Sequence, residues 1–281
     1  MIWLIISYLL YAINNVVWKW LAANGEPVYL INRRSMFTSM LAFAALLYTV
    51  PQPFDFLALD EFRLLLLSCS LGVIGLLTMV TALQQVSLRM LGYYSILGIV
   101  VNGYYSYILQ NQKLNTGLIL ASLLILGGFI LFQWDETRKS TNKQQTLKQH
   151  LMMLLMTLCF SLSGIIAWNI IDTLRPIEMM ATQEIFVLLV SSSILLLKKS
   201  KKKDAVKPAL YLFPIFALII GGAVFSGLMG LKINNPYIAA IGGLAVPLLT
   251  VAFGAIFFRE KMNVRQVIAF VLVISGEILM I

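Results

Sequence analysis

The chain has 281 residues, of which 60% are hydrophobic and only 12% are charged, and its 21 Lys and Arg against 12 Asp and Glu give a formal net charge of +9. Soluble domains carry about a quarter charged residues, so this composition and a mean hydropathy of +0.88 exclude a soluble protein. The excess positive charge is expected in loops at one membrane face rather than on a surface that binds nucleic acid.

Apolar windows long enough to cross a bilayer recur along the whole chain. A spanning helix needs about 20 mostly apolar residues, and ten windows meet this requirement: 2–21, 30–50, 63–86, 91–110, 116–134, 150–171, 177–198, 209–231, 236–257 and 264–281. No basic segment precedes the first window, which we interpret as a membrane helix rather than a signal peptide. The sequence therefore predicts an all-α integral membrane protein with ten transmembrane helices.

The two halves of the chain resemble each other. Residues 108–132 align without a gap on 256–280, with identical residues that include Lys113/Lys261, Asn115/Asn263, Ala121/Ala269 and Gly128/Gly276. A second alignment superposes 11–27 on 160–176. Because each copy holds five helices, an odd number, the second must enter the membrane from the opposite side. We predict two inverted five-helix repeats, 1–134 and 150–281, joined by a polar linker at 135–149; a general likeness of apolar helices is the alternative explanation.

The end of the second copy carries a recognisable pattern. Pro247 lies early in the penultimate helix, Arg259 and Glu260 end that helix, and a short turn leads to a helix with one glycine, Gly276. This pattern resembles the EamA domain of the drug/metabolite transporter superfamily. The first copy repeats it more weakly, with Gln112 in place of Glu260. The resemblance implies ten helices around a central cavity that opens alternately to each side and moves small metabolites; we expect Glu260 to pin the last hairpin.

Basic residues are distributed unevenly between the two sides. In a ten-helix chain the odd-numbered loops share one side, and all of the 21 Lys and Arg residues except Arg63, Lys113, Arg175 and Lys232 fall in those loops or their flanks. The positive-inside rule makes that side cytoplasmic and puts both termini outside the cell (inner) membrane, against the usual family orientation. The lysine-rich run at 198–207 is then a topology determinant, or alternatively a patch for anionic lipid or a partner.

Polar and aromatic side chains form a stripe on the first helix. Tyr11, Asn14 and Trp18 recur at helical spacing with Asn15 beside them, and the corresponding helix of the second copy ends with Trp168 and Asn169. Polar groups are costly in hydrocarbon and are expected to face a cavity or another helix. One interpretation is hydrogen bonding between helices; the other is a cavity wall that offers amides and rings to a substrate.

Further substrate-cavity candidates lie on other helices. Asn102, Tyr104 and Tyr105 lie deep in the fourth window, Gln84 ends the third, and Ser226 lies in a ladder of small residues in the eighth. Gln84 and Ser226 have ordinary helix packing as their alternative role. Pro247 is a gate candidate, because a proline withdraws a backbone hydrogen bond and lets a helix flex.

Glu184 is the deepest acidic residue, about seven residues inside the seventh window. We predict either a site for a proton or cation that couples transport, or a structural ion pair with Arg33 or Arg34. No cofactor or metal is predicted, because Cys69 and Cys159 lie in apolar windows and His150 is the only histidine.

The function predicted from the sequence is secondary transport, not enzymatic catalysis. The best substrate class is an amino acid or similar small polar or zwitterionic compound, with export favoured, by alternating access and with proton coupling as the candidate energy source. The alternatives are a non-transporting membrane scaffold or receptor, and an intramembrane enzyme that acts on lipid. Expected partners are the small-molecule substrate and the lipid bilayer, with no nucleic acid; monomer and homodimer both stay open.

Overall fold

A computed structural model describes residues 1–281 except 24, 110–115, 140–142, 198–210, 235–242 and 280–281. The described residues form ten α-helices and one 3₁₀ helix, η1, and contain no strand. The helices are α1 (Ile2–Ala22), α2 (Pro27–Thr49), η1 (Asp55–Ala58), α3 (Glu61–Leu83), α4 (Leu88–Leu109), α5 (Thr116–Lys139), α6 (Lys143–Ile170), α7 (Pro176–Leu197), α8 (Leu212–Ile233), α10 (Ala245–Phe258) and α11 (Val264–Leu279).

The two prolines superposed by the sequence alignment each open a helix. Pro27 begins α2 and Pro176 begins α7, positions at which a missing N–H costs nothing because the first turn has no intrahelical acceptor for it. Each start is also capped by a carboxylate. Glu26 accepts the N–H of Tyr29 at 2.7 Å, and Glu178 accepts the N–H of Arg175 at 2.7 Å.

The segment predicted to be a polar linker is largely helical. Residues 135–139 belong to α5 and residues 143–149 belong to α6, while 140–142 lie outside the described residues. The segment is rich in Lys and Gln, which favour helix. These two helices therefore continue beyond their apolar parts, and in α6 the apolar span itself covers residues 147–170.

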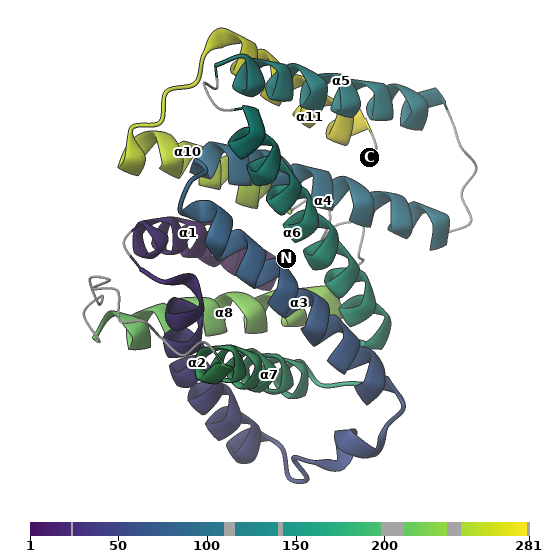
Figure 1. The fold of residues 1–281 in the computed structure, drawn as a ribbon. Helices are drawn as coiled ribbons and strands as arrows, with labels where there is room; N and C mark the ends of the chain where they lie inside the picture. The colour runs from purple at the N-terminus through teal and green to yellow at the C-terminus, as the bar shows by residue number, and fades with distance from the viewer. Residues whose placement is uncertain (24, 110–115, 140–142, 198–210, 235–242, 280–281) are drawn as a thin grey trace.

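The helices are stacked in pairs (Figure 1). At the top of the view α5 packs on α11, below them α4 packs on α10, and in the lower part α2 packs on α7. The middle is formed by α1 against α8 and α3 against α6, and α6 also contacts α4 as α1 contacts α10. Helices from both ends of the chain therefore alternate through the whole bundle.

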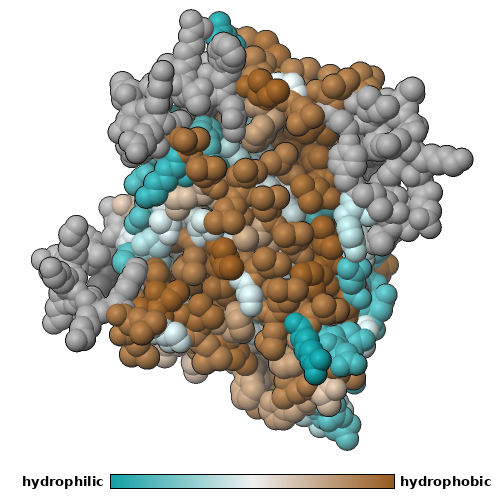
Figure 2. Space-filling model, turned by 45° about the vertical axis from the view of Figure 1, so that its right-hand side comes forward, coloured by the Kyte–Doolittle hydropathy of each residue, from teal (hydrophilic) through white to brown (hydrophobic). Residues whose placement is uncertain are grey.

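The outer surface is strongly apolar. Figure 2 shows one face as a broad hydrophobic surface with hydrophilic residues gathered toward its margins. Among the described residues, five helices are long and apolar enough to cross a membrane: α1, α3, residues 147–170 of α6, α7 and α8. Shorter apolar stretches lie in α4, α5, α10 and α11. Exposed Leu and Ile side chains on α5 and α8, such as Leu123 and Leu218, would be a liability in water and suit contact with lipid.

The polar residues of α2 are turned toward its neighbours. Asn32 donates to the hydroxyls of Ser191 at 3.2 Å and Ser192 at 2.8 Å on α7, and Arg34 pairs with Glu184 on the same helix. A helix with this many polar side chains falls short of the hydropathy of a membrane span, yet Asn32 and Arg34 contact polar groups of α7 inside the bundle.

Two glycines set the contact between α5 and α11. A Cβ atom added at Gly128 would lie 2.7 Å from the carbonyl oxygen of Ala269, and one added at Gly276 would lie 2.7 Å from the carbonyl oxygen of Ala121. Partner numbers fall along α11 as they rise along α5, so the two helices pack antiparallel. The absence of a side chain at both positions lets the backbones approach closely.

This contact yields a test with a matched control inside one dipeptide. Gly128→Ala should lower the melting temperature of the detergent-purified protein, because relieving the overpacked contact costs about 1 to 3 kcal/mol. Gly127→Ala should leave it unchanged or raise it, since an added Cβ there meets nothing within 4 Å and alanine favours helix. Equal melting temperatures for the two variants would contradict the packing described here.

Candidate functional site

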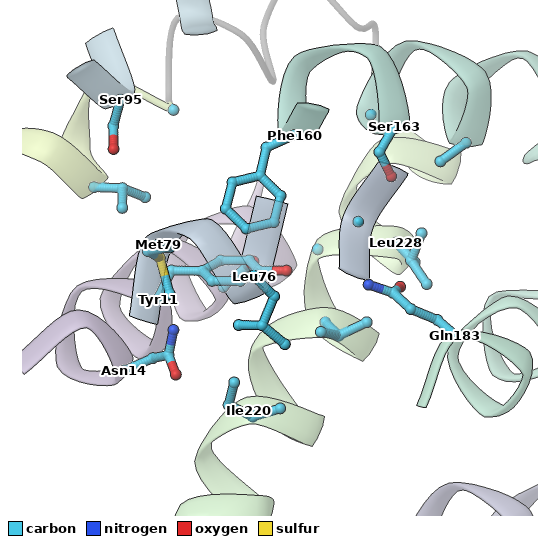
Figure 3. A pocket seen from close by; sticks show the side chains of 18 of the residues that line it. Tyr11, Asn14, Leu76, Met79, Ser95, Phe160, Ser163, Gln183, Ile220 and Leu228 are labelled. Carbon is cyan, nitrogen blue, oxygen red and sulfur yellow. The ribbon is translucent and has the colours of Figure 1, made fainter. Parts of the chain in front are cut away.

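A cavity of about 500 Å³ lies in the middle of the bundle. Residues of α1, α2, α3, α4, α6, α7, α8 and α10 line it, whereas no described residue of α5 or α11 does. Figure 3 shows labelled side chains converging on it from α1 (Tyr11, Asn14), α3 (Leu76, Met79), α4 (Ser95), α6 (Phe160, Ser163), α7 (Gln183) and α8 (Ile220, Leu228). The volume is within the range of pockets for small organic molecules.

Most of the residues predicted from the sequence are placed at this wall. They are Tyr11, Asn14, Asn15 and Trp18 of α1, Asn102 of α4, Trp168 of α6, Glu184 of α7 and Pro247 of α10. The stripe on α1 therefore faces the interior along its whole length. Its hydrogen bonds show that some of its residues bond to neighbouring helices, whereas others leave polar groups open to the cavity.

Some members of the stripe are used for packing and some are free. Ser7 donates to the carbonyl oxygen of Ala223 at 2.9 Å, and Asn15 donates to the hydroxyl of Thr250 at 3.0 Å, so these groups tie α1 to α8 and α10. Among the described residues, the side-chain oxygen of Asn14 and the indole N–H of Trp18 have no hydrogen-bond partner although both are buried. Buried polar groups left unpaired in this way are the ones available to a ligand.

Four other predicted residues do not line the cavity. Gln84 follows α3 and donates to the carbonyl oxygen of Gly25 at 3.0 Å, so it closes a helix end. Asn169 is exposed and donates to the hydroxyl of Tyr105 at 2.9 Å, and this pair lies beyond the wall because it is nearer the helix ends. Ser226 donates to carbonyl oxygens of its own helix. The side chain of Tyr104 lies outside the described residues.

Several polar residues of the wall were missed from the sequence. Ser68 on α3 and Ser163 on α6 each donate to the other's carbonyl oxygen at 2.9 Å, and Gln183 and Ser95 also line the cavity. Isolated hydroxyls in apolar helices look like ordinary helix contacts, and only the position of the neighbouring helix shows that they border a cavity. The adjacency of Gln183 to Glu184 was the one available signal.

The ion pair expected at Glu184 exists, and its partner is Arg34. The Nη1 atom of Arg34 donates to Oε1 of Glu184 at 2.9 Å, and both side chains are only 2% exposed. The Trp18 ring lies 6.0 Å from the guanidinium carbon, within the range of a cation–π contact. The Nε and Nη2 atoms of Arg34 and the Oε2 atom of Glu184 have no partner among the described residues. The pair is therefore buried, borders a cavity, and is incompletely hydrogen-bonded among the described residues.

Pro247, the predicted gate residue, lies at the start of α10. Within the described residues α10 begins at Ala245, so Pro247 lies in the first turn, where no intrahelical bond is withdrawn and no kink is imposed. Its role is contact with α4: a Cβ atom added at Gly92 would lie 3.0 Å from the carbonyl oxygen of Pro247. The role of Pro247 as a gate stays a prediction.

Glu260, expected from its place at a helix end to pin the last hairpin, joins that hairpin to α4. Its two carboxylate oxygens accept the backbone N–H groups of Leu88 at 2.9 Å and Arg89 at 3.0 Å, which caps the start of α4. Nearby, the Lys19 ammonium donates to the carbonyl oxygens of Leu83 at 2.9 Å and Val86 at 2.6 Å. This end of the bundle is therefore closed by charged groups that cap helix ends.

Metal binding has no support in the described part of the chain. No group of three His, Cys, Asp or Glu residues close enough to hold an ion occurs there. Cys69 and Cys159 are buried free thiols on different helices.

The apolar surface and the multiple apolar helices define a multi-pass α-helical membrane protein. Residues 147–281 match the EamA-like transporter family, so the predicted resemblance is confirmed over these residues. Comparison with curated proteins gave no match. One solved crystal structure superposes with a TM-score of 0.68 and 14% identity over 99% of this chain and 94% of the other, a likeness that shows the fold alone.

The buried pair can be tested through stability. Glu184→Leu should lower the free energy of unfolding by about 3 to 5 kcal/mol, because it leaves the Arg34 charge buried without its partner. The double variant Arg34→Met/Glu184→Leu should recover most of the loss, since it removes both charges. The measurement is thermal unfolding of the purified protein, with Arg33→Met as control; a double variant no more stable than Glu184→Leu would contradict a direct coupling of the two residues.

Proposed function

We propose that the protein is a secondary transporter that carries a small polar metabolite through the central cavity by alternating access. The observation that carries this proposal is the cavity itself, which lies where helices of both halves meet and is lined by unpaired polar groups of Asn14, Trp18 and Asn102. A scaffold has no need of buried polar groups without partners, because each costs free energy when desolvated.

Ten spanning helices in two inverted repeats are part of the proposal. Under the predicted correspondence, α5 with α11, α4 with α10 and α2 with α7 are pairs of equivalent helices that pack on each other. Gly128 on α5 contacts Ala269 on α11, and Gly276 on α11 contacts Ala121 on α5. The alignment makes Gly128 equivalent to Gly276 and Ala121 equivalent to Ala269, so the second contact repeats the first with the halves exchanged. Such reciprocal contacts support a two-fold relation between the halves. Because α5 and α11 run antiparallel, the axis would lie in the membrane plane.

The cavity chemistry favours a neutral or zwitterionic cargo. Its polar groups are amides, hydroxyls and the net-neutral pair of Arg34 and Glu184, and its aromatic groups include Tyr11 and Trp168. A polyanion would require several unpaired cationic side chains, and Arg34 is the one Lys or Arg among the described wall residues. We therefore infer that the cargo is an amino acid or a compound of similar size and polarity.

Coupling to a proton gradient is proposed to depend on Glu184. In proteoliposomes, amino-acid accumulation driven by a pH gradient should be lost in Glu184→Gln, while exchange without a gradient is retained, because glutamine keeps the shape and cannot take up a proton. The radiolabelled amino-acid flux is measured with and without the gradient. Normal gradient-driven accumulation by the variant would rule out Glu184 as the coupling site, and the absence of flux in the unsubstituted protein would favour the scaffold or receptor alternative.

The proposed orientation rests on the distribution of basic residues and has its own test. The loop at 198–207, which lies outside the described residues, should be cytoplasmic, and both termini external. Single cysteines introduced in this loop, in a variant lacking Cys69 and Cys159, should resist a membrane-impermeant maleimide in intact cells and react after the cells are permeabilised. Cysteines placed at residue 2 serve as the control for the external side; labelling of the loop in intact cells would reverse the orientation.

A further inference from the structure

We propose that Arg34 is the binding group for a carboxylate of the cargo. Glu184 pairs with Arg34 until protonation of the Glu184 carboxylate breaks the ion pair. The proposal rests on the proposed transport function and adds to it the substrate group and the order in which proton and cargo bind. In this scheme the Glu184 carboxylate acts as a built-in competitor for the guanidinium. Its protonation removes the competitor and leaves the arginine for an external carboxylate.

The unused hydrogen-bonding capacity of Arg34 supports this role. Only Nη1 is engaged by Glu184, through a single bond of 2.9 Å, while Nε and Nη2 have no partner among the described residues. A guanidinium binds a carboxylate best through two parallel bonds, so the observed pair is a weak version of what this side chain can make. A purely structural pair buried to 2% exposure would be expected to satisfy these groups.

Among the groups around Arg34, Glu184 is the one whose charge changes when it takes up a proton. The described charged or titratable neighbours are Arg34 on α2, Tyr11 on α1 and Cys69 on α3, and the last two are near enough to interact with its charge. The part of α8 that borders the cavity contributes Ile220 and Val224, which do not titrate. Arg33 on α2 lies over the Tyr29 ring at 5.2 Å and does not line the cavity. Removal of the Glu184 charge by a proton therefore leaves Arg34 without another anion.

The rest of the cavity indicates what accompanies the carboxylate. The side-chain oxygens of Asn14 and Asn102 are buried acceptors with no described partner, and they suit an ammonium or hydroxyl donor. Leu76, Met79 and Leu228 present an apolar part of the wall. Together these groups fit a small carboxylate with an apolar body and one donor group, as in an amino acid with an aliphatic side chain.

The order of binding fixes the direction of coupling. A proton on Glu184 and a carboxylate on Arg34 favour each other, so both are carried in the same bound state and cross the membrane in the same direction. A transporter in which proton and cargo compete for one group would instead exchange them. With an inward proton gradient this arrangement drives uptake, which differs from the export favoured on sequence grounds.

Binding of defined probes to the purified protein in lipid nanodiscs tests the proposal. The probes are L-leucine, its amide L-leucinamide, isocaproate, which is leucine without its amino group, and isocaproamide. A free carboxyl stays ionised between about pH 5.5 and about pH 8, so the protonation change that matters is on the protein. Affinities are measured by titration calorimetry at both pH values.

We expect L-leucine and isocaproate to bind at least about tenfold more tightly at the lower pH, within the usual range of coupling between sites. The two amides should bind weakly at both. In Glu184→Gln the carboxylates should bind tightly and equally at both pH values, because the competitor is permanently uncharged. Arg34→Lys keeps the charge and the ion pair. The affinity for the carboxylate probes should fall in this variant, because lysine cannot form the two parallel hydrogen bonds that a guanidinium makes to a carboxylate. Arg33→Met is the control and should behave as the unsubstituted protein.

Three results would overturn the proposal: equal binding of carboxylates and amides, no change of carboxylate affinity with pH, or retained pH dependence in Glu184→Gln. The melting temperature of each variant, recorded first, shows that loss of binding is not loss of folding. Failure of the transport function would be seen separately, as the absence of flux in proteoliposomes for a protein that still binds these probes. If the probes bind as expected but no flux is seen, the proposed carboxylate site stands and the proposed transport function is wrong.

Discussion

The hydrocarbon interior of a bilayer offers no hydrogen-bond partner, so every polar group at that depth must find one inside the protein or line a cavity. The position of α2 follows from this constraint. Its Asn32 and Arg34 would be costly against lipid, and they are turned toward hydroxyl and carboxylate groups of α7. The two helices are thus held together by polar contacts rather than by apolar attraction, which lipid supplies equally well.

The same constraint accounts for the way the other helices pack. Small residues bring backbones together where helices cross, as Gly128 and Gly276 do between α5 and α11, and serine hydroxyls bond to carbonyl oxygens across α3 and α6. Because most polar groups in this closely packed bundle are hydrogen-bonded, few are left without a partner. Most of the buried oxygens and nitrogens without a partner among the described residues lie around the central cavity, on Asn14, Trp18, Asn102, Arg34 and Glu184. This concentration makes the cavity a candidate site rather than a packing defect.

The sequence predicted the helical fold and one wall of the cavity because both depend on local periodicity. Spacing alone puts Tyr11, Asn14 and Trp18 on one face of α1, whatever lies opposite. It could not separate Arg33 from Arg34, since adjacent residues differ only in direction around the helix and the approach of α7 decides which one meets Glu184. It also could not assign Ser68 and Ser163, whose role exists only where two helices cross.

Under the proposed two-fold relation between the halves, the charged pair is a feature that is not repeated. The alignment that superposes Pro27 on Pro176 also superposes Arg34 on Gln183 and Ser35 on Glu184, so each half supplies one charged residue at neighbouring positions and an uncharged residue at the other. Two identical halves would give inward-open and outward-open states of similar free energy. In the proposed transport cycle a lone ion pair would remove that equivalence, because the two states would differ in how far they expose the pair to water. A ligand or proton can shift an equilibrium only through a difference of this kind, so the asymmetry at Arg34 and Glu184 is the part of the structure through which a proton gradient would bias the direction of transport.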